Sequence, residues 1–166
     1  TDIKSSVCNY LTHLVCRNEV MPEDTAIVIN KIHSQRLCWQ HSTRHSVCCF
    51  IATERLCGLG ILVASVHVPD SSYSDDTYQT TLEEVADSLA SLPTRYVAKG
   101  IIVGVDANLQ VCSRHLNSLV GPLCTGRGAL SDRHIALYTF LQRFDLRLTN
   151  SFPVGRVCGE PLPRPL

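Results

Sequence analysis

The residues best suited to chemistry stand at the ends of apolar runs. Residues 104–108 read GVDAN, so a carboxylate, Asp106, and an amide, Asn108, lie two positions apart and can point the same way. Such a carboxylate can accept a proton from an attacking water, and the amide can donate to a phosphoryl oxygen or hold that water. The alternative is a turn, because Asp and Asn side chains commonly bond nearby backbone after a strand. On these five residues alone the turn is favoured.

A histidine and an arginine are the other candidates. His67 lies in residues 65–69 (SVHVP), at the end of a second apolar run, where a lone histidine more often packs than acts in catalysis. Arg127 stands between two glycines ahead of residues 131–133 (SDR), where its guanidinium could reach a phosphate or a base. A loop that leads into a helix is the alternative for this segment. Both alternatives stay open on the residues alone.

The strands that would position these residues follow from runs of apolar, β-branched side chains. Residues 59–68 are apolar on both faces, which is typical of a central strand covered on both sides. Residues 101–105 form a second buried run, and shorter runs at 26–29 and 47–53 predict two more strands. A ragged strand is expected near residues 37–39.

Helical spacing separates the two longest runs. Apolar residues recur every three or four positions in 82–92, and Thr81 with Glu84 predicts a capping box at the first turn. Pro93 ends this predicted helix. Residues 1–25 carry little pattern, and their apolar positions fit either a short helix or an irregular strand.

A second helix and a last strand complete the predicted elements. Residues 133–144 carry an apolar stripe with Ser131 or Asp132 as the N-cap, and residues 146–149 predict a short strand. Residues 153–166 are rich in proline and glycine and are expected to be disordered. Hairpin strands come first and helix-separated strands later, which predicts an α/β domain with a mixed sheet and helices packed on it.

The composition is that of a globular domain. The chain has 166 residues, of which 45% are hydrophobic and 18% charged, enough for one domain with a core. Lysine plus arginine and aspartate plus glutamate balance at 15 each, which argues against a broad basic surface for nucleic acid. This balance leaves open an enzyme that holds one phosphate with a few residues. No apolar run reaches the length of a membrane span, so no membrane partner is expected.

The cysteines point to a reducing compartment. There are nine of them, without a CxxC pair, and we interpret them as reduced, small core residues of an intracellular protein, with the nucleus left open. The alternative is a zinc site that uses Cys38 with His41, and His45 with Cys48. These pairs have suitable local spacing but stand in a polar connecting segment, so zinc is the less favoured interpretation.

Taken in order, these segments resemble the endonuclease/exonuclease/phosphatase family, and most of all the apurinic-endonuclease-like domains of LINE-type retrotransposons. The resemblance covers roughly residues 26–152. It depends on a His-x-Pro strand end at 67–69, a Gly-x-Asp-x-Asn strand end at 104–108, a polar-Arg helix start at 131–133 and the NSF sequence at 150–152. The Asp-x-Asn pair is the specific part, and the order of the segments carries most of the weight.

The resemblance implies a four-layered α/β sandwich over residues 1–152 and a Mg²⁺-dependent phosphodiesterase, most specifically a retrotransposon-type DNA endonuclease. It implies that Asp106 orients or deprotonates the attacking water and that Asn108 holds the scissile phosphate. His67 would contact that phosphate or assist the leaving group. Nucleic acid is the substrate expected for the intact family.

The same resemblance implies substrate-binding roles for Asn150 and Arg127. Glu19 is the only early candidate for the family's metal-binding glutamate, and it stands closer to the strand at residue 26 than the family usually allows. The family's closing Asp-His strand has no counterpart, so we expect a domain truncated at both ends that binds Mg²⁺ weakly by itself. Two alternatives stay open: a non-catalytic remnant of such a domain, and a phosphatase or deadenylase of the same fold.

Overall fold

The computed structural model divides the chain into two compact units, Thr1–Asn108 and Leu109–Leu166. The structure describes residues 13–15, 25–30, 33, 35–53, 58–112, 118–124 and 129–151. The segment 153–166, for which disorder is predicted, lies outside these ranges.

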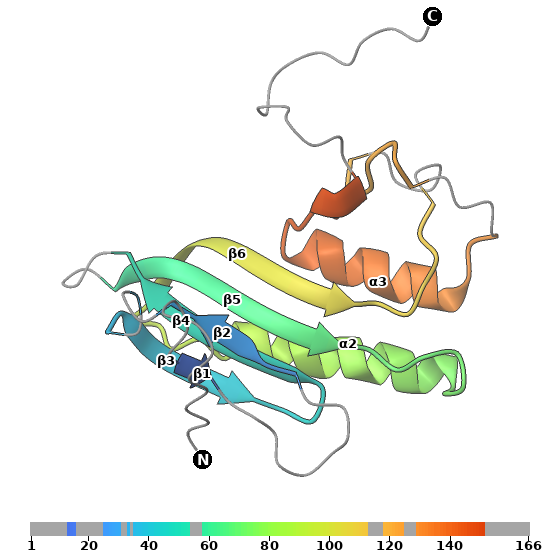
Figure 1. Ribbon diagram of the computed structural model, residues 1–166. Helices are drawn as coiled ribbons and strands as arrows, with labels where there is room; N and C mark the ends of the chain where they lie inside the picture. The colour runs from blue at the N-terminus through green and yellow to red at the C-terminus, as the bar shows by residue number, and fades with distance from the viewer. Residues whose placement is uncertain are drawn as a thin grey trace, which may run out of the picture. The chain divides into compact units, whose positions relative to one another are not determined.

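In its described residues, the first unit contains two sheets and one long helix (Figure 1). Its elements are β1 (His13–Val15), β2 (Ile27–Ile29), β3 (Leu37–Ser42), β4 (Ser46–Ala52), β5 (Leu59–His67), α2 (Asp75–Ala90) and β6 (Val97–Asp106). Four strands form a sheet in the order β3-β4-β5-β6, and β1 pairs with β2 in a separate antiparallel sheet. Within the larger sheet β3, β4 and β5 are antiparallel neighbours, whereas β5 and β6 are parallel. The expectation of an α/β protein with a mixed sheet is therefore confirmed.

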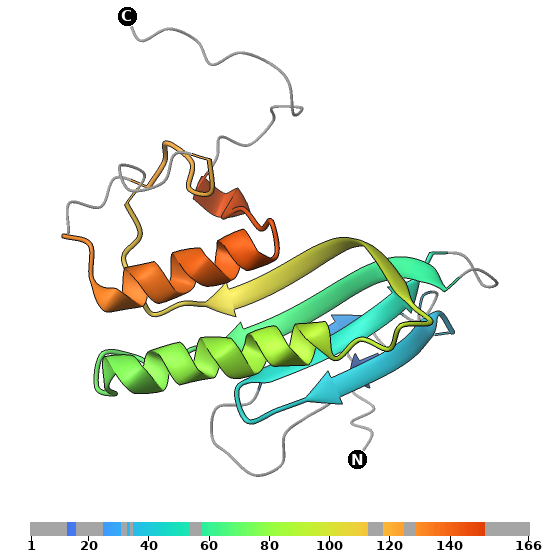
Figure 2. The same cartoon turned by 180° about the vertical axis from the view of Figure 1, so that it is seen from behind.

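Strand β5 occupies an inner position in the larger sheet, as its apolar sequence predicted. One set of alternating residues is fully buried and the other is half-buried. Helix α2 packs on β4 and β5 on one side of the sheet, and β1 and β2 lie on the other side (Figures 1 and 2). We call these two sides the α2 face and the β2 face. The first unit is thus built in three layers, one helical and two of β-sheet.

Strand β4 is the most deeply buried element, because it is covered on both sides. Ile27 and Ile29 of β2 pack against Val47 and Cys49 on the β2 face. Cys48 alternates to the α2 face, and both cysteine side chains are fully buried as free thiols. Adjacent cysteines on opposite faces of one strand fit the interpretation of small core residues.

Helix α2 begins earlier than the sequence analysis predicted. Its N-cap is Ser74, whose hydroxyl oxygen accepts a 3.1 Å hydrogen bond from the backbone N–H of Thr77. Thr81 lies inside the helix and its hydroxyl donates to the carbonyl of Thr77, so the predicted capping box of Thr81 and Glu84 is wrong. The first turn escaped detection because it is polar, with Asp75 and Asp76 favouring a helix start through charge rather than through apolar spacing.

The second unit contains α3 (Asp132–Arg143) and the short 3-10 helix η1 (Thr149–Ser151). Ser131 is the N-cap of α3, one of the two residues that the sequence predicted. The predicted strand at 146–149 is wrong, since only Leu148 forms an isolated parallel bridge, with Val120. The backbone turns back on itself there, because Ser151 donates to Leu148 and accepts from the N–H of Gly121.

Candidate functional site

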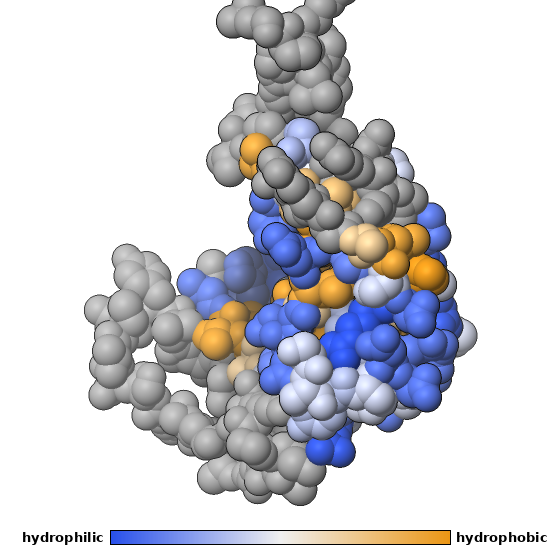
Figure 3. Space-filling view, turned by 90° about the vertical axis from the view of Figure 1, so that its right-hand side faces the viewer, coloured by the Kyte–Doolittle hydropathy of each residue, from blue (hydrophilic) through white to orange (hydrophobic). Residues whose placement is uncertain are grey.

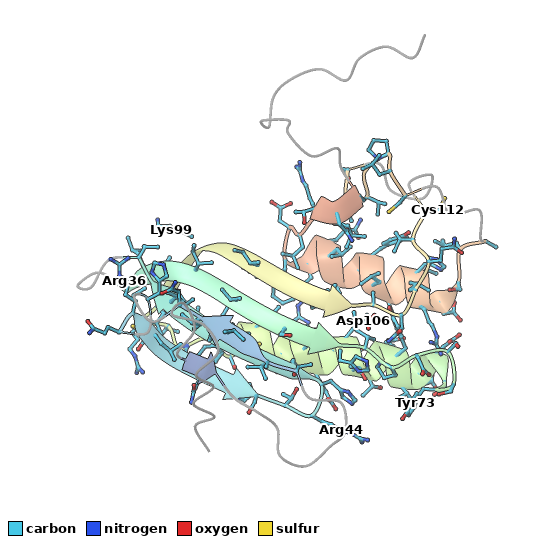
Figure 4. The ribbon with its side chains drawn as sticks, in the orientation of Figure 1. Arg36, Arg44, Tyr73, Lys99, Asp106 and Cys112 are labelled. Carbon is cyan, nitrogen blue, oxygen red and sulfur yellow. The ribbon has the colours of Figure 1, made fainter. Side chains whose placement is uncertain are left out.

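The parallel pairing of β5 and β6 brings His67 and Asp106 side by side. Both strands run toward the same edge, and their register makes His67 and Asp106 direct partners at the last rung. Neighbouring strands lie about 5 Å apart, so the two side chains emerge next to each other. His67 is half-buried with its Nδ1 atom shielded from solvent, whereas Asp106 is exposed (Figure 4).

These two side chains project from the β2 face. Val66 and Val105 are partners on the α2 face, so the following pair, His67 with Asp106, points to the opposite side. Hydrophilic residues predominate among the described residues on the side toward which β5 and β6 run (Figure 3). The pair is thus anchored at the ends of two apolar strands.

A second histidine, His45, extends the row. It lies in the turn between β3 and β4, and its carbonyl accepts a 3.0 Å hydrogen bond from the backbone N–H of His67. This bond continues the β4–β5 ladder by one residue, because Ser46 already pairs with Val66. His45, His67 and Asp106 therefore stand in a row across three strand ends, which we call the His-His-Asp row.

From the sequence, His45 was expected only as a zinc ligand together with Cys48. Cys48 lies on the α2 face and is covered there, whereas the ladder places His45 beside His67 on the β2 face. The alternation of β4 therefore separates the two proposed zinc ligands. The signal that could have found His45 is its place one residue before β4, which is antiparallel to the strand ending at His67.

The turn between His45 and β3 is fixed by a threonine. The hydroxyl oxygen of Thr43 accepts hydrogen bonds from the backbone N–H groups of His45 and Ser46, at 3.3 and 3.2 Å. The hydroxyl groups of Thr43 and Ser46 also bond to each other at 2.9 Å. Arg44, at the tip of this turn, is exposed (Figure 4). A turn held in this way gives His45 a defined position relative to His67.

The Asp-x-Asn segment forms a tight turn that ties the two strand ends together. Asn108 has a φ of 44°, in the left-handed region, and its side-chain Nδ2 donates a 2.7 Å hydrogen bond to the carbonyl of Val68. Its backbone N–H donates to Asp106 Oδ1 at 3.3 Å. Val68 N–H in turn donates to the backbone carbonyl of Asp106 at 3.1 Å. Residues 106–108 therefore form a turn, which was the alternative interpretation of this segment.

The turn does not remove its residues from chemistry. An amide nitrogen carries two protons, so Asn108 can hold Val68 with one and offer the other to a ligand. Asp106 keeps a second carboxylate oxygen beyond the one that accepts from Asn108. Helix α2 supports the turn from below, because the Tyr78 hydroxyl donates a 2.9 Å hydrogen bond to the carbonyl of Ala107. Both polar side chains are therefore held in place by backbone contacts.

The other predicted site residues belong to the second unit or lie outside the described residues. Asn150 is exposed and belongs to η1, in the second unit. Arg127 and Glu19 lie outside the described residues. The structure thus brings together His67, Asp106 and Asn108, all within the first unit.

The donor atoms of the row fit a magnesium ion only in part. Mg²⁺ prefers oxygen ligands and is commonly held by one or two carboxylates together with water and substrate phosphate. Asp106 supplies one such carboxylate, whereas the imidazole nitrogens of His45 and His67 suit a phosphate better. Among the described residues there is no group of three or more His, Cys, Asp or Glu side chains that could hold a metal ion.

Comparisons with protein-family models, with curated proteins and with solved structures found no match for this chain. In the described part of the chain, neither helix is long and apolar enough to cross a membrane. The row and the neighbouring Asn108 together provide one carboxylate, two imidazoles and one amide at the ends of paired strands.

Proposed function

We propose that this chain is a phosphodiesterase-type domain of the endonuclease/exonuclease/phosphatase fold, acting on DNA as a retrotransposon-type endonuclease. The observation that carries the proposal is the register of β5 and β6, which pairs His67 with Asp106 at the carboxyl edge of parallel strands. Ligands of α/β sheets bind outside the carboxyl ends of parallel strands, so this edge is the expected place for a substrate.

The residues of the row have complementary chemical roles in this proposal. Asp106, exposed and oriented by the turn, accepts a proton from the water that attacks the phosphate. His67 and His45 donate hydrogen bonds to phosphate oxygens or to the leaving oxygen. Asn108 positions Asp106 and can contact the phosphate with its second amide proton. Mg²⁺, when bound by Asp106 and substrate oxygens, would neutralise charge that develops on the phosphate.

The layering of the first unit supports the finer architecture that we propose, a four-layered sandwich. Such a fold places two sheets face to face, each covered by helices on its outer side. Here α2 covers the outer side of the larger sheet, and β2 packs on its inner side through Ile27 and Ile29. The first unit thus has the order of helix, sheet and sheet that three of the four layers require.

Nicking of supercoiled plasmid tests the proposal. We expect Mg²⁺-dependent nicking by the wild-type chain and a loss of about 10²–10⁴-fold in Asp106→Asn, since that is the range of a lost general base. Asp145→Asn is the matched control: Asp145 is exposed, belongs to the second unit, and has a φ of 49°, which asparagine also tolerates. Equal nicking by both variants contradicts the role of Asp106.

A specific observation favours a second candidate, a non-catalytic remnant. The hydrogen bonds of Asp106 and Asn108 to the backbone are sufficient reason for these residues to form a turn. In that case the wild-type chain has no Mg²⁺-dependent activity on plasmid, on a phosphatase substrate such as p-nitrophenyl phosphate, or on polyadenylate. Activity on one of the latter two substrates alone would identify the phosphatase or deadenylase alternative.

A further inference from the structure

In the described part of the chain, β6 is the outer strand of the larger sheet, and most of its residues are apolar. Among the described residues, β5 is its sole strand partner. Helix α2 packs on β4 and β5. Ile102 on the β2 face of this strand is 58% exposed, and Val97 at its start is 49% exposed. An edge of this kind is a template for pairing with another chain.

The hydrogen bonds of β6 to β5 fix which of its backbone groups face outward. The carbonyl of Asp106 accepts from Val68, so the backbone of residue 106 turns toward β5. Alternate residues of a strand turn to alternate sides, so those of Ile101, Val103 and Val105 turn away from β5. These outward N–H and C=O groups are the ones that a further strand would bond.

We propose that two copies of this chain pair through β6, antiparallel, about a two-fold axis at Ile102. Residues 100–104 read GIIVG, which is nearly the same in both directions. The axis sets Ile101 of one copy opposite Val103 of the other, where both have outward-facing backbone groups and exchange hydrogen bonds. A self-complementary patch is what a two-fold interface requires. The product is a continuous eight-stranded sheet.

Charge selects the antiparallel direction. The register of β6 slips at Lys99, which is an extra residue between the rungs of Ala98 and Gly100. The two-fold axis places Ala98 opposite Asp106 of the second copy, so Lys99 stands within one residue of that carboxylate. Each dimer therefore has two such pairs, one at each end of the apolar segment. Parallel pairing in register would instead place like charges opposite each other, which is destabilising.

The two glycines of the segment agree with a close approach by a second chain. A Cβ atom at Gly100 would meet nothing within 4 Å, and one at Gly104 would only touch the Ala64 carbonyl oxygen at 3.8 Å. Packing among the described residues therefore does not require glycine at either position. Glycine in a strand often marks a place where another backbone comes close. The axis at Ile102 sets Gly100 of one copy opposite Gly104 of the other.

Cysteine cross-linking tests the register. In a Cys38→Ser background, which removes an exposed native thiol, Ile102→Cys places two thiols opposite each other on the axis. Directly opposed residues have Cα atoms within the separation that a disulfide spans. Val97→Cys is the matched control, since Val97 is similarly exposed on the same strand but lies off the axis. We expect at least tenfold more intermolecular disulfide at 102, located by mass spectrometry.

Sedimentation under reducing conditions tests the dimer itself. The wild-type chain is expected to be a dimer at micromolar concentration, and Ile102→Lys a monomer, because two lysines would meet on the axis. Val28→Lys, at an equally exposed residue of β2, should stay dimeric, and a thermal melt checks that both variants fold. A monomeric wild-type chain overturns the proposal, as does equal cross-linking at 97 and 102. None of these substitutions replaces a residue of the His-His-Asp row, and sedimentation and cross-linking report the dimer whether or not the chain nicks plasmid.

Discussion

At the scale of single residues, the His-His-Asp row depends on backbone register rather than on a sequence motif. His45 and His67 are 22 positions apart in the sequence and become neighbours through one hydrogen bond of 3.0 Å. Asp106 joins them through the parallel pairing of β5 and β6. Two imidazoles beside one carboxylate are suited to hold a phosphate and to transfer a proton near it.

Replacing each histidine separates these roles. If the proposed function holds, His67→Gln should reduce the rate of nicking by about 10²-fold, because it loses a donor next to Asp106. His45→Gln should act mainly on KM, since it is one strand farther from the carboxylate. His41→Gln, an exposed histidine of β3 stacked on Trp39, is the control and should leave both constants unchanged. Steady-state nicking kinetics check this, and equal effects of all three changes would contradict it.

At the scale of elements, the strands were predictable and the polar starts and ends were not. Continuous runs of apolar, β-branched residues located β2, β4, β5 and β6. Two of these strands still expose one face, since Val28 of β2 is 55% exposed and Ile102 of β6 is 58% exposed. The start of α2 was missed since its first turn, at Asp75 and Asp76, is polar. Residues 146–149 have the composition of a strand, but in the structure only Leu148 forms a bridge, with Val120. A sequence pattern shows the composition of a segment and not whether a neighbouring strand is there to pair with it.

The site was predictable to the same extent. His67, Asp106 and Asn108 were located because each follows an apolar run, and strand ends are where α/β sheets carry chemistry. The expectation that the run at 101–105 is buried was wrong, because β6 is the outer strand among the described residues and its residues are half-buried or exposed. His45 was predicted only as a zinc ligand, because its place beside His67 does not show in its own sequence neighbourhood. Its position depends on pairing between β4 and β5, and pairing is a long-range property that single residues do not encode.

The cap of α2 can be measured. Ser74→Ala should lower the free energy of unfolding by about 1 kcal/mol, because Thr77 loses the acceptor of its N–H. Glu84→Ala should change it by less than about 0.5 kcal/mol, as expected for an exposed helix position away from the cap. Urea denaturation of the two variants gives both values. A larger loss in Glu84→Ala would restore the capping box at Thr81.

At the scale of the whole molecule, the chain consists of two units that differ in secondary structure. The first holds both sheets and α2, and the second holds α3 and η1. The positive and negative charges of the full chain balance, which gives the chain no general attraction to nucleic acid. An activity on DNA would therefore depend on local contacts at the His-His-Asp row. The stability of the chain depends strongly on β4, which is covered from both sides.

Alkaline pH should destabilise this core. Burial raises the pKa of the Cys48 thiol from 9.0 to about 11, and burial together with the Cys48 charge raises that of Cys49 to about 11. Because the thiols ionise at lower pH in the unfolded chain than in the folded one, rising pH favours the unfolded chain. The contribution of the two thiols to the free energy of unfolding is therefore complete below pH 9 and is lost as the pH rises toward 11. The loss should be on the order of 2 kcal/mol for each thiol.

Denaturation curves at pH 8 and pH 10.5 check this expectation under reducing conditions. A Cys48→Ala, Cys49→Ala variant is less stable at pH 8 but should lose less stability between the two values. Lysine and tyrosine ionisation acts on both proteins, so the difference between them isolates the thiols. An equal loss in both would show that the buried thiols do not control the alkaline transition.

The parallel pairing of β5 and β6 has a consequence for the order of folding. β3, β4 and β5 follow one another along the chain and can form as a meander from local contacts. His45 and His67 belong to that meander. Asp106 reaches His67 only after the chain has closed a loop through all of α2, and closing a longer loop costs more entropy and slows folding. The carboxylate is therefore expected to join the two histidines late, so a nascent chain holds a pair of imidazoles before it holds a complete site.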